Sequence, residues 1–93
     1  TNTSTNNFRR LERVVKGFAN HRRLEILNLL HKEPELSLEE IAERLGIGYE
    51  NAYEHVRKMA IAGLILKRSD SKSVRHKLTD KAVHILTFCK SLE

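Results

Sequence analysis

The sequence has few cysteine, proline and aromatic residues, and it contains no tryptophan. Cys89 and Pro34 are the single members of their kinds, and the aromatic side chains are two tyrosines and three phenylalanines. One cysteine excludes an internal disulfide, which agrees with a reducing compartment. No apolar run approaches the length of a membrane span, and the polar N-terminal residues lack the apolar region of a signal peptide. We therefore expect a cytoplasmic protein with no membrane partner.

The sequence also lacks the patterns on which enzymes and metal sites depend. It has no Ser/His/Asp set, Gly-rich phosphate loop or pair of carboxylates at a pocket-like position. Surface or half-buried positions are expected for His21, His31, His76 and His84. We expect no catalytic residue, no cofactor and no metal site, with a zinc site between subunits as the alternative. For Cys89 we expect a buried structural thiol, with a redox-sensing thiol as the alternative.

What the chain does have is charge gathered in blocks. Its net charge is +5. Residues 1–32 hold seven basic and two acidic residues, residues 33–54 one basic and seven acidic, and residues 55–81 eight basic and two acidic. Segregated basic charge is typical of proteins that bind a polyanion, although Lys and Arg also serve only to solubilise a surface. The length of 93 residues allows one domain with a modest core.

Residues 37–64 predict two short helices joined by a tight turn. Ser37 and Glu40 have the spacing of a capping box, which starts a helix. Gly46 follows the last apolar residue of that helix, where a left-handed residue ends it at low cost. A second helix is expected over about residues 48–62. Such a pair occurs in any small helical bundle, but it is also a helix-turn-helix, whose second helix can enter a DNA major groove.

The flanking segments complete the expected fold. Residues 1–7 contain only Thr, Asn and Ser and predict a disordered tail, so one domain is expected over residues 8–93. Apolar residues at helical spacing predict helices over residues 8–19 and 22–31, the second of them the buried centre.

Residues 64–78 predict a β-hairpin, because two strand-like runs flank a turn-rich segment. Alternation in the second run places Val74, His76 and Leu78 on one face and Arg75 and Lys77 on the other. A last helix is expected over residues 80–91. A hairpin after a helix-turn-helix is a wing. The expected fold is therefore mainly α with a small β-hairpin, a winged helix-turn-helix of about five helices with a two- to three-stranded wing sheet.

This order of elements resembles the winged helix-turn-helix transcriptional regulators of the ArsR type, over roughly residues 14–82. Residues 19–27, Ala-Asn-His-Arg-Arg-Leu-Glu-Ile-Leu, look like the Ala-Asp-Pro-Thr-Arg-Leu-Arg-Ile-Leu segment of that family. Residues 45–55 and 62–65 resemble its recognition helix and the exit from it. Leu-Thr-Asp-Lys-Ala at residues 78–82 looks like the Leu-Thr-x-Lys-Gly that follows many wings, including those of the MarR type.

The resemblance implies a regulator that binds double-stranded DNA as a homodimer, with residues 48–62 in the major groove and the wing, residues 65–78, on the backbone. The chain departs from the metal-sensing branches of the family. Residues 38–45 hold no Cys or His where one branch has Cys-x-Cys. Asp80, His84 and Cys89 do not have the spacing of the last-helix metal ligands of another branch.

The candidate DNA contacts lie on the second helix of the pair and on the hairpin. Arg can bind guanine bidentately, Glu can accept from the cytosine amino group, and wing cations can neutralise phosphates. The residues are Tyr49, Glu50, Asn51, Tyr53, Glu54, Arg57, Lys72, Arg75 and Lys77. Two of them, Glu50 and Glu54, place acid where DNA phosphates would lie close. For His55, which matches a family histidine, we expect a structural or backbone-contact role.

Apolar stripes on the first and last helices predict a homodimer interface, because they are wider than the core of so short a chain requires. The expected interface residues are Phe8, Leu11, Val15, Phe18, Ile85, Leu86, Phe88 and Cys89. Two alternatives to a sequence-specific regulator remain open. One is a winged-helix module that binds a basic protein through its acidic helix face. The other is an architectural protein that binds duplexes without sequence choice.

Overall fold

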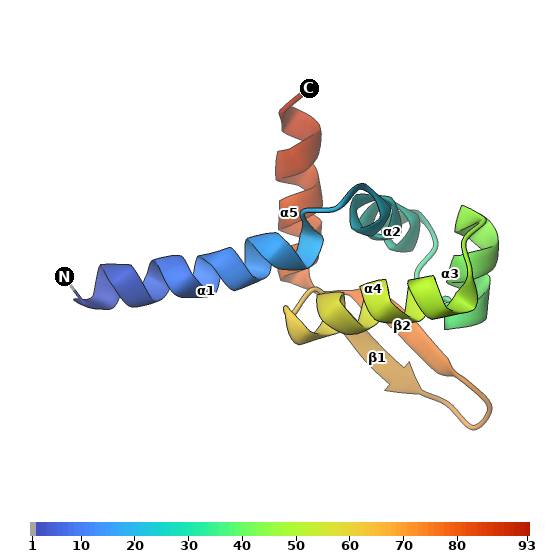
Figure 1. Ribbon diagram of the computed structural model, residues 1–93. Coiled ribbons are helices and arrows are strands. Elements are labelled where there is room, and N and C mark those ends of the chain that lie inside the picture. Colours follow the sequence, from blue (N-terminus) through green and yellow to red (C-terminus); the bar gives the residue numbers. More distant parts are fainter. Residues whose placement is uncertain (1) are drawn as a thin grey trace.

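Within residues 2–93, five helices and one β-hairpin make up the fold (Figure 1). The computed structural model describes these residues, with side chains from Asn7 onward. The elements are α1 (Asn2–Phe18), α2 (His21–Lys32), α3 (Leu38–Leu45), α4 (Tyr49–Ile61), β1 (Ile65–Ser69), β2 (Val74–Leu78) and α5 (Asp80–Ser91). The predicted fold class, a mainly α winged helix-turn-helix, is confirmed.

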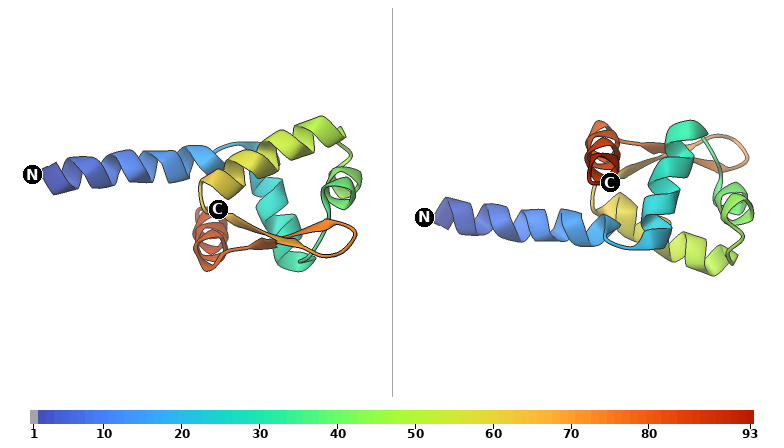
Figure 2. Two further views of the ribbon diagram at one scale, coloured as in Figure 1. Left: turned by 90° about the horizontal axis from the view of Figure 1, so that it is seen from below. Right: turned by 90° about the horizontal axis from the view of Figure 1, so that it is seen from above.

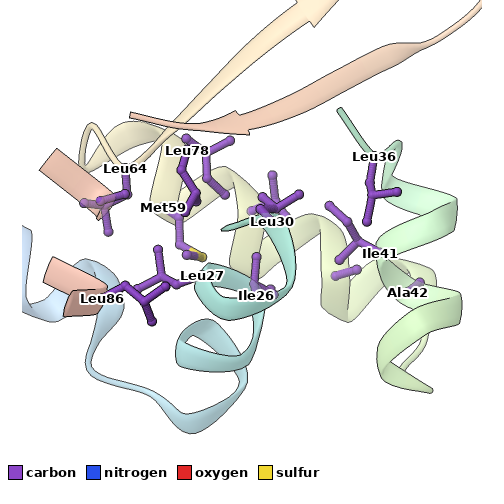
Figure 3. Close-up of a cluster of buried hydrophobic side chains, with 14 residues drawn as sticks. Ile26, Leu27, Leu30, Leu36, Ile41, Ala42, Met59, Leu64, Leu78 and Leu86 are labelled. Carbon is purple, nitrogen blue, oxygen red and sulfur yellow. The ribbon is translucent and has the colours of Figure 1, made fainter. Parts of the chain in front are cut away.

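Helix α2 forms the centre of the core. Its Ile26, Leu27 and Leu30 are buried, and it contacts each of the other helices and β2. Figure 3 shows these side chains meeting residues from α3, α4 and α5. Burying one such side chain contributes about 1.5–3 kcal/mol to folding, so α2 is the element on which the other helices depend.

The helix-turn-helix is built as its sequence signals predict. The Ser37 hydroxyl accepts a hydrogen bond from the Glu40 backbone N–H at 3.2 Å, and the Glu40 carboxylate accepts one from the Ser37 N–H at 2.9 Å. Gly46 has φ of 67°, the left-handed conformation that ends α3. Because Gly48 has no side chain to cap α4, that helix begins without a side-chain hydrogen bond.

The wing is an antiparallel pair in which Ile65 lies opposite Leu78 and Ser69 opposite Val74. Asp70 closes the turn between the strands by accepting hydrogen bonds from two backbone N–H groups, at 2.9 and 2.8 Å. These bonds, together with a neighbouring guanidinium, lower the pKa of Asp70 to about 2. The turn is therefore shaped by a carboxylate that stays ionised.

His76 anchors the wing to the body, and the surface or half-buried position expected for it is wrong. Its side chain is only 1% exposed, and its Nδ1 lies 2.8 Å from the carbonyl oxygen of Leu36. The two residues also form an isolated antiparallel bridge beside the two-stranded sheet. Alternation places His76 on the inward face of β2, and β2 packs there against α2, α3 and α5.

Helix α1 begins at Asn2, whereas the sequence predicts a helix from Phe8 and a disordered tail over residues 1–7. Thr1 lies outside the described residues. A helix adds residues more easily than it nucleates, so a stretch of weak helix formers can continue one that begins beside it. Figures 1 and 2 show α1 extending away from the other elements, with only its C-terminal end against them.

Candidate nucleic-acid interface

The outward face of α4 presents the predicted base-contacting residues to solvent. Ala52, Val56 and Met59 are buried, so the opposite side of the helix faces away from the core. Arg57 is half-buried and the other candidates are exposed: Tyr49, Glu50, Asn51, Tyr53 and Glu54. Their phenol, carboxylate, amide and guanidinium groups include both donors and acceptors, as the reading of base edges requires.

An ion pair organises the middle of this face. The Nε and Nη2 atoms of Arg57 donate to one carboxylate oxygen of Glu54, at 3.2 and 2.9 Å. Glu50, one turn before Glu54, forms no ion pair with any side chain in residues 7–93. One acidic residue therefore holds an arginine in position, and the other stands unneutralised on the same face.

The wing divides its cations into two groups. Arg75 donates to Asp70 at 3.1 Å and to the Glu35 carbonyl oxygen at 3.2 Å, so it braces the turn. Lys72 and Lys77 are exposed, and neither pairs with an acidic group of the described side chains. Of the three predicted phosphate contacts, two are thus free to meet a phosphate, while Arg75 is engaged within the wing.

A cleft brings the wing turn beside the start of α4. It has a volume of about 220 Å³ and is lined by Tyr49, by Lys72 to Val74 and by the first residues of α3. The first turn of α3 contributes Ser37 and Glu39 to its wall. This cleft unites α4 and the wing, which the sequence predicts as separate contacts, into one continuous surface.

A contact that the sequence did not reveal holds the other side of α4. The Nε atom of Arg23 donates to Nδ1 of His55 at 3.1 Å, and its Nη1 donates to the Lys16 carbonyl oxygen at 2.9 Å. For His55, for which a structural or backbone-contact role is expected, this bond supplies a structural contact. Burial, followed by the charges of Arg23, Lys58 and their neighbours, lowers the pKa of His55. No sequence signal joins Arg23 to His55, because 32 positions separate them.

The expected dimer residues differ in exposure, and the structure corrects one residue, Leu86. Phe8, Leu11, Val15 and Phe88 are exposed by 69%, 54%, 48% and 61%, while Phe18, Ile85 and Cys89 are half-buried. Leu86 is only 5% exposed and belongs to the core around α2, so it is not available to a partner. The stripe on α5 is wide because one of its sides packs inward. A groove of about 550 Å³ separates α1 from the start of α5.

The described part of the chain offers neither a cluster of metal ligands nor a helix suited to cross a membrane. No group of three or more His, Cys, Asp or Glu side chains in that part of the chain is placed to hold a metal ion. Over the same residues, none of the helices combines the length and the apolar character that crossing a membrane requires.

The chain matches one family of known sequences and several solved structures. The sequence model of the HVO_A0114 family matches residues 19–85. No curated protein matches the chain. Among solved structures, NolR from Sinorhizobium fredii is 22% identical with a TM-score of 0.90, and the match covers 99% of this chain and 92% of that one. The transcriptional regulator HlyU from Vibrio vulnificus is 26% identical with a TM-score of 0.76, covering 98% and 95%.

A third solved structure carries the same fold in solution. It is the homodimeric winged helix-turn-helix DNA-binding domain Mb0332 from Mycobacterium bovis, a possible ArsR-family regulator. It is 22% identical with a TM-score of 0.89, and the match covers 99% of this chain and 85% of that one. The resemblance to winged helix-turn-helix regulators of the ArsR type is confirmed at the level of fold. With its family model matched over residues 19–85, the chain belongs to the HVO_A0114 family.

Proposed function

We propose that this protein is a transcriptional regulator that binds specific double-stranded DNA as a homodimer, with α4 in the major groove and the wing on the backbone. The observation that carries the proposal is the exposed polar face of α4, which a cleft of about 220 Å³ joins to the wing lysine Lys72. A helix fits the major groove, and flanking cations fix it there through phosphates. We place the protein in the cytoplasm, with its DNA, and assign it no enzymatic role.

Sequence choice is assigned to the carboxylates of α4. Near phosphates, Glu50 and Glu54 weaken binding to any duplex, so a protein without sequence preference gains nothing from them. A carboxylate that accepts from the cytosine amino group instead rejects a base that presents only acceptors. Glu54 also holds Arg57 at 2.9 Å, which orients a guanidinium that can bind guanine.

The homodimer is assigned to the exposed apolar residues of α1 and α5. Phe8 and Phe88 are 69% and 61% exposed, which is unusual for aromatic side chains on a monomer unless they mark a binding surface. Mb0332, with the same fold, is described as homodimeric. A two-fold dimer would bind half-sites spaced by about one helical turn, roughly 34–36 Å.

The test is in vitro selection from random duplexes, followed by competition binding against the selected sequence. Glu50→Gln and Glu54→Gln should each raise affinity for random duplex. At least one should narrow the ratio of specific to random affinity, by about 1–3 kcal/mol for a bidentate contact. If selection enriches no sequence, specific regulation is wrong. Salt-sensitive binding to every duplex would then indicate an architectural protein, and no binding would indicate a module that docks a basic protein on α4.

A metal effector is not part of the proposal, because soft and borderline metals need three or four converging ligands. Titration of the folded protein with zinc or cadmium should reveal no tight stoichiometric site. A tight site whose occupation lowers DNA affinity would contradict this expectation.

A further inference from the structure

A second basic surface lies at the other end of α4 from the wing turn. A groove of about 400 Å³ is formed there where α1, α2 and α4 meet, and we call it the junction groove. Its lining includes four cations, Arg13, Lys16, Arg23 and Lys58, together with Gly17, Ile61 and Ala62. Figure 2 shows the C-terminal ends of α1 and α4 side by side, remote from the hairpin turn.

The charge of the junction groove is largely unneutralised. Arg13 and Lys58 form no ion pair with any described side chain. Lys16 pairs with Glu12 at 3.4 Å, but both side chains are more than half exposed, so the pairing is weak. The positive charge of the groove also affects His55. Burial is the largest cause that lowers the pKa of His55, and the charges of Arg23 and Lys58 lower it further.

The groove is held in shape by a brace and a close contact. Arg23 joins three helices, since it lies on α2 and donates to His55 of α4 and to the Lys16 carbonyl of α1. Because His55 accepts through Nδ1, its proton resides on Nε2, which is a donor. A Cβ atom on Gly17 would lie only 2.5 Å from that of Ala62, so α1 and α4 are already as near as their backbones allow.

The position of the groove relative to α4 indicates what it binds. Lys58 directly follows Arg57, which lies on the outward face of α4. Helical spacing puts Lys58 on the same side of the helix as His55, away from Tyr49 and the wing cleft. The 13 residues of α4 span about 20 Å, longer than the roughly 12 Å width of a major groove. Cations at both ends and on both sides of this helix can therefore reach the two strands that border one groove.

We propose that the junction groove binds a backbone phosphate of the DNA strand opposite to the strand that the wing binds. Arg13 and Lys58 contact the phosphate, and Arg23 is a positioning residue that keeps them beside α4. The inference rests on the proposed DNA binding. It adds a second phosphate site, formed by α1 and α2 together with the C-terminal end of α4. DNA is favoured over a small free anion because Lys58 directly follows Arg57, a candidate base contact on the outward face of α4.

The test compares Arg13→Ala and Lys58→Ala with the control Lys32→Ala, at the far end of α2. Each groove variant should flatten the dependence of log affinity on log salt by about 0.9 on both selected and random duplex. Raising salt from about 50 to about 200 mM then weakens each variant roughly 3.5 times less than the unaltered protein. Lys32→Ala should leave the slope unchanged. Circular dichroism melts confirm that every variant is folded.

Ethylation interference on the selected duplex supplies a second measurement. The unaltered protein should show sensitive phosphates on both strands that border the groove holding α4. In Lys58→Ala the set on one strand should be lost, and the set lost in Lys72→Ala should be the other. If the unaltered protein binds no duplex, the proposed function itself fails. If it binds but Arg13→Ala and Lys58→Ala keep its slope and its full interference pattern, the junction groove is not a phosphate site.

Tight stoichiometric binding of inorganic phosphate without DNA, seen as shifts of the Arg13 and Lys58 signals in an NMR titration at constant ionic strength, would also overturn the proposal. It would make the groove a small-anion site. Shifts only at high phosphate concentration, with loss of the slope on mutation, would support the DNA contact.

Discussion

The wing and helix α1 both project from the core, but they differ in how they are attached to it. The wing is tied to the body by buried His76, by its bridge to Leu36, and by the ion pairs of Arg68 with Glu35 and of Arg75 with Glu40. Helix α1 contacts the body only at its C-terminal end and leaves Phe8 and Leu11 exposed. The wing is therefore held in place within one chain, whereas α1 leaves exposed the apolar residues that we propose a second copy covers.

The largest expected effect breaks the partnership of α1. Phe8→Asp/Phe88→Asp should convert the protein from dimer to folded monomer, because central aromatic contacts in an interface contribute about 2 kcal/mol or more each. Sedimentation at tens of micromolar measures the mass. Leu66→Asp is the matched control, since Leu66 is 58% exposed but lies on the wing. A double variant of unchanged mass, or a monomer before mutation, would contradict the assignment.

The second effect concerns the attachment of α1 to the body. Gly17→Ala places a methyl group 2.5 Å from the Ala62 Cβ, so it should destabilise the α1 contact by about 1–3 kcal/mol, as overpacking does. Chemical denaturation measures the change. Adding Ala62→Gly in the same chain removes the obstructing methyl and should recover most of the loss. If the double variant is no more stable than Gly17→Ala, the two helices do not meet as described.

A smaller effect distinguishes Lys72 of the wing, which is unpaired among the described side chains, from Arg75, which is hydrogen-bonded to Asp70. Lys72→Ala should flatten the salt dependence of DNA binding by about one unit, because an unpaired lysine can release one counterion from a phosphate. Arg75→Ala should weaken binding at least as much, since it also leaves Asp70 without its guanidinium beside the DNA. Binding titrations over a range of salt measure the affinity of each variant and the slope of its salt dependence. An unchanged slope in Lys72→Ala would remove the wing turn from the backbone.

The smallest effect tests the buried anchor of the wing. Burial lowers the pKa of His76 below its ordinary 6.5, while the Leu36 carbonyl opposes the shift and Lys67 adds to it. The unfolded chain then takes up a proton before the folded one does. Stability from His76 should be fully present above pH 6.5 and fall as the pH drops through 6.5 toward the lowered value.

Thermal melts between neutral and mildly acidic pH follow this loss. His76→Gln should reduce the pH dependence, leaving the part due to His55, whose pKa is also lowered. A melting temperature of His76→Gln with the same pH dependence as the unaltered protein would mean that the wing anchor does not titrate in this range.

The sequence predicts the elements well wherever the signal is local. The Ser37–Glu40 box and the left-handed Gly46 each act within a few residues, so the helix that they bound lies where expected. The start of α1 was missed because Thr, Asn and Ser give neither a strong helix signal nor a break. The sequence of such residues gives no sign that the helix beside them extends through them.

The candidate site was predictable in outline and not in its pairings. Helical spacing put Glu54 and Arg57 on one face, but it could not say that Arg75 would be engaged with Asp70. The inward position of Leu86 and the bond between Arg23 and His55 depend on which helices pack together. Such contacts arise from tertiary structure, and a single sequence records them only as residues compatible with it.

The close contact between Gly17 and Ala62 has a mechanical consequence. The contact joins the Gly17 backbone to the Ala62 methyl group, and neither has a long side chain that could bend to absorb a displacement. Helix α1 has its C-terminal end against Ala62, just after α4, and the rest of its length carries the exposed apolar residues that we propose for the dimer interface. A change in the angle at which two copies join would therefore turn the two α4 helices relative to each other, and so reset the spacing of the sequences they can reach.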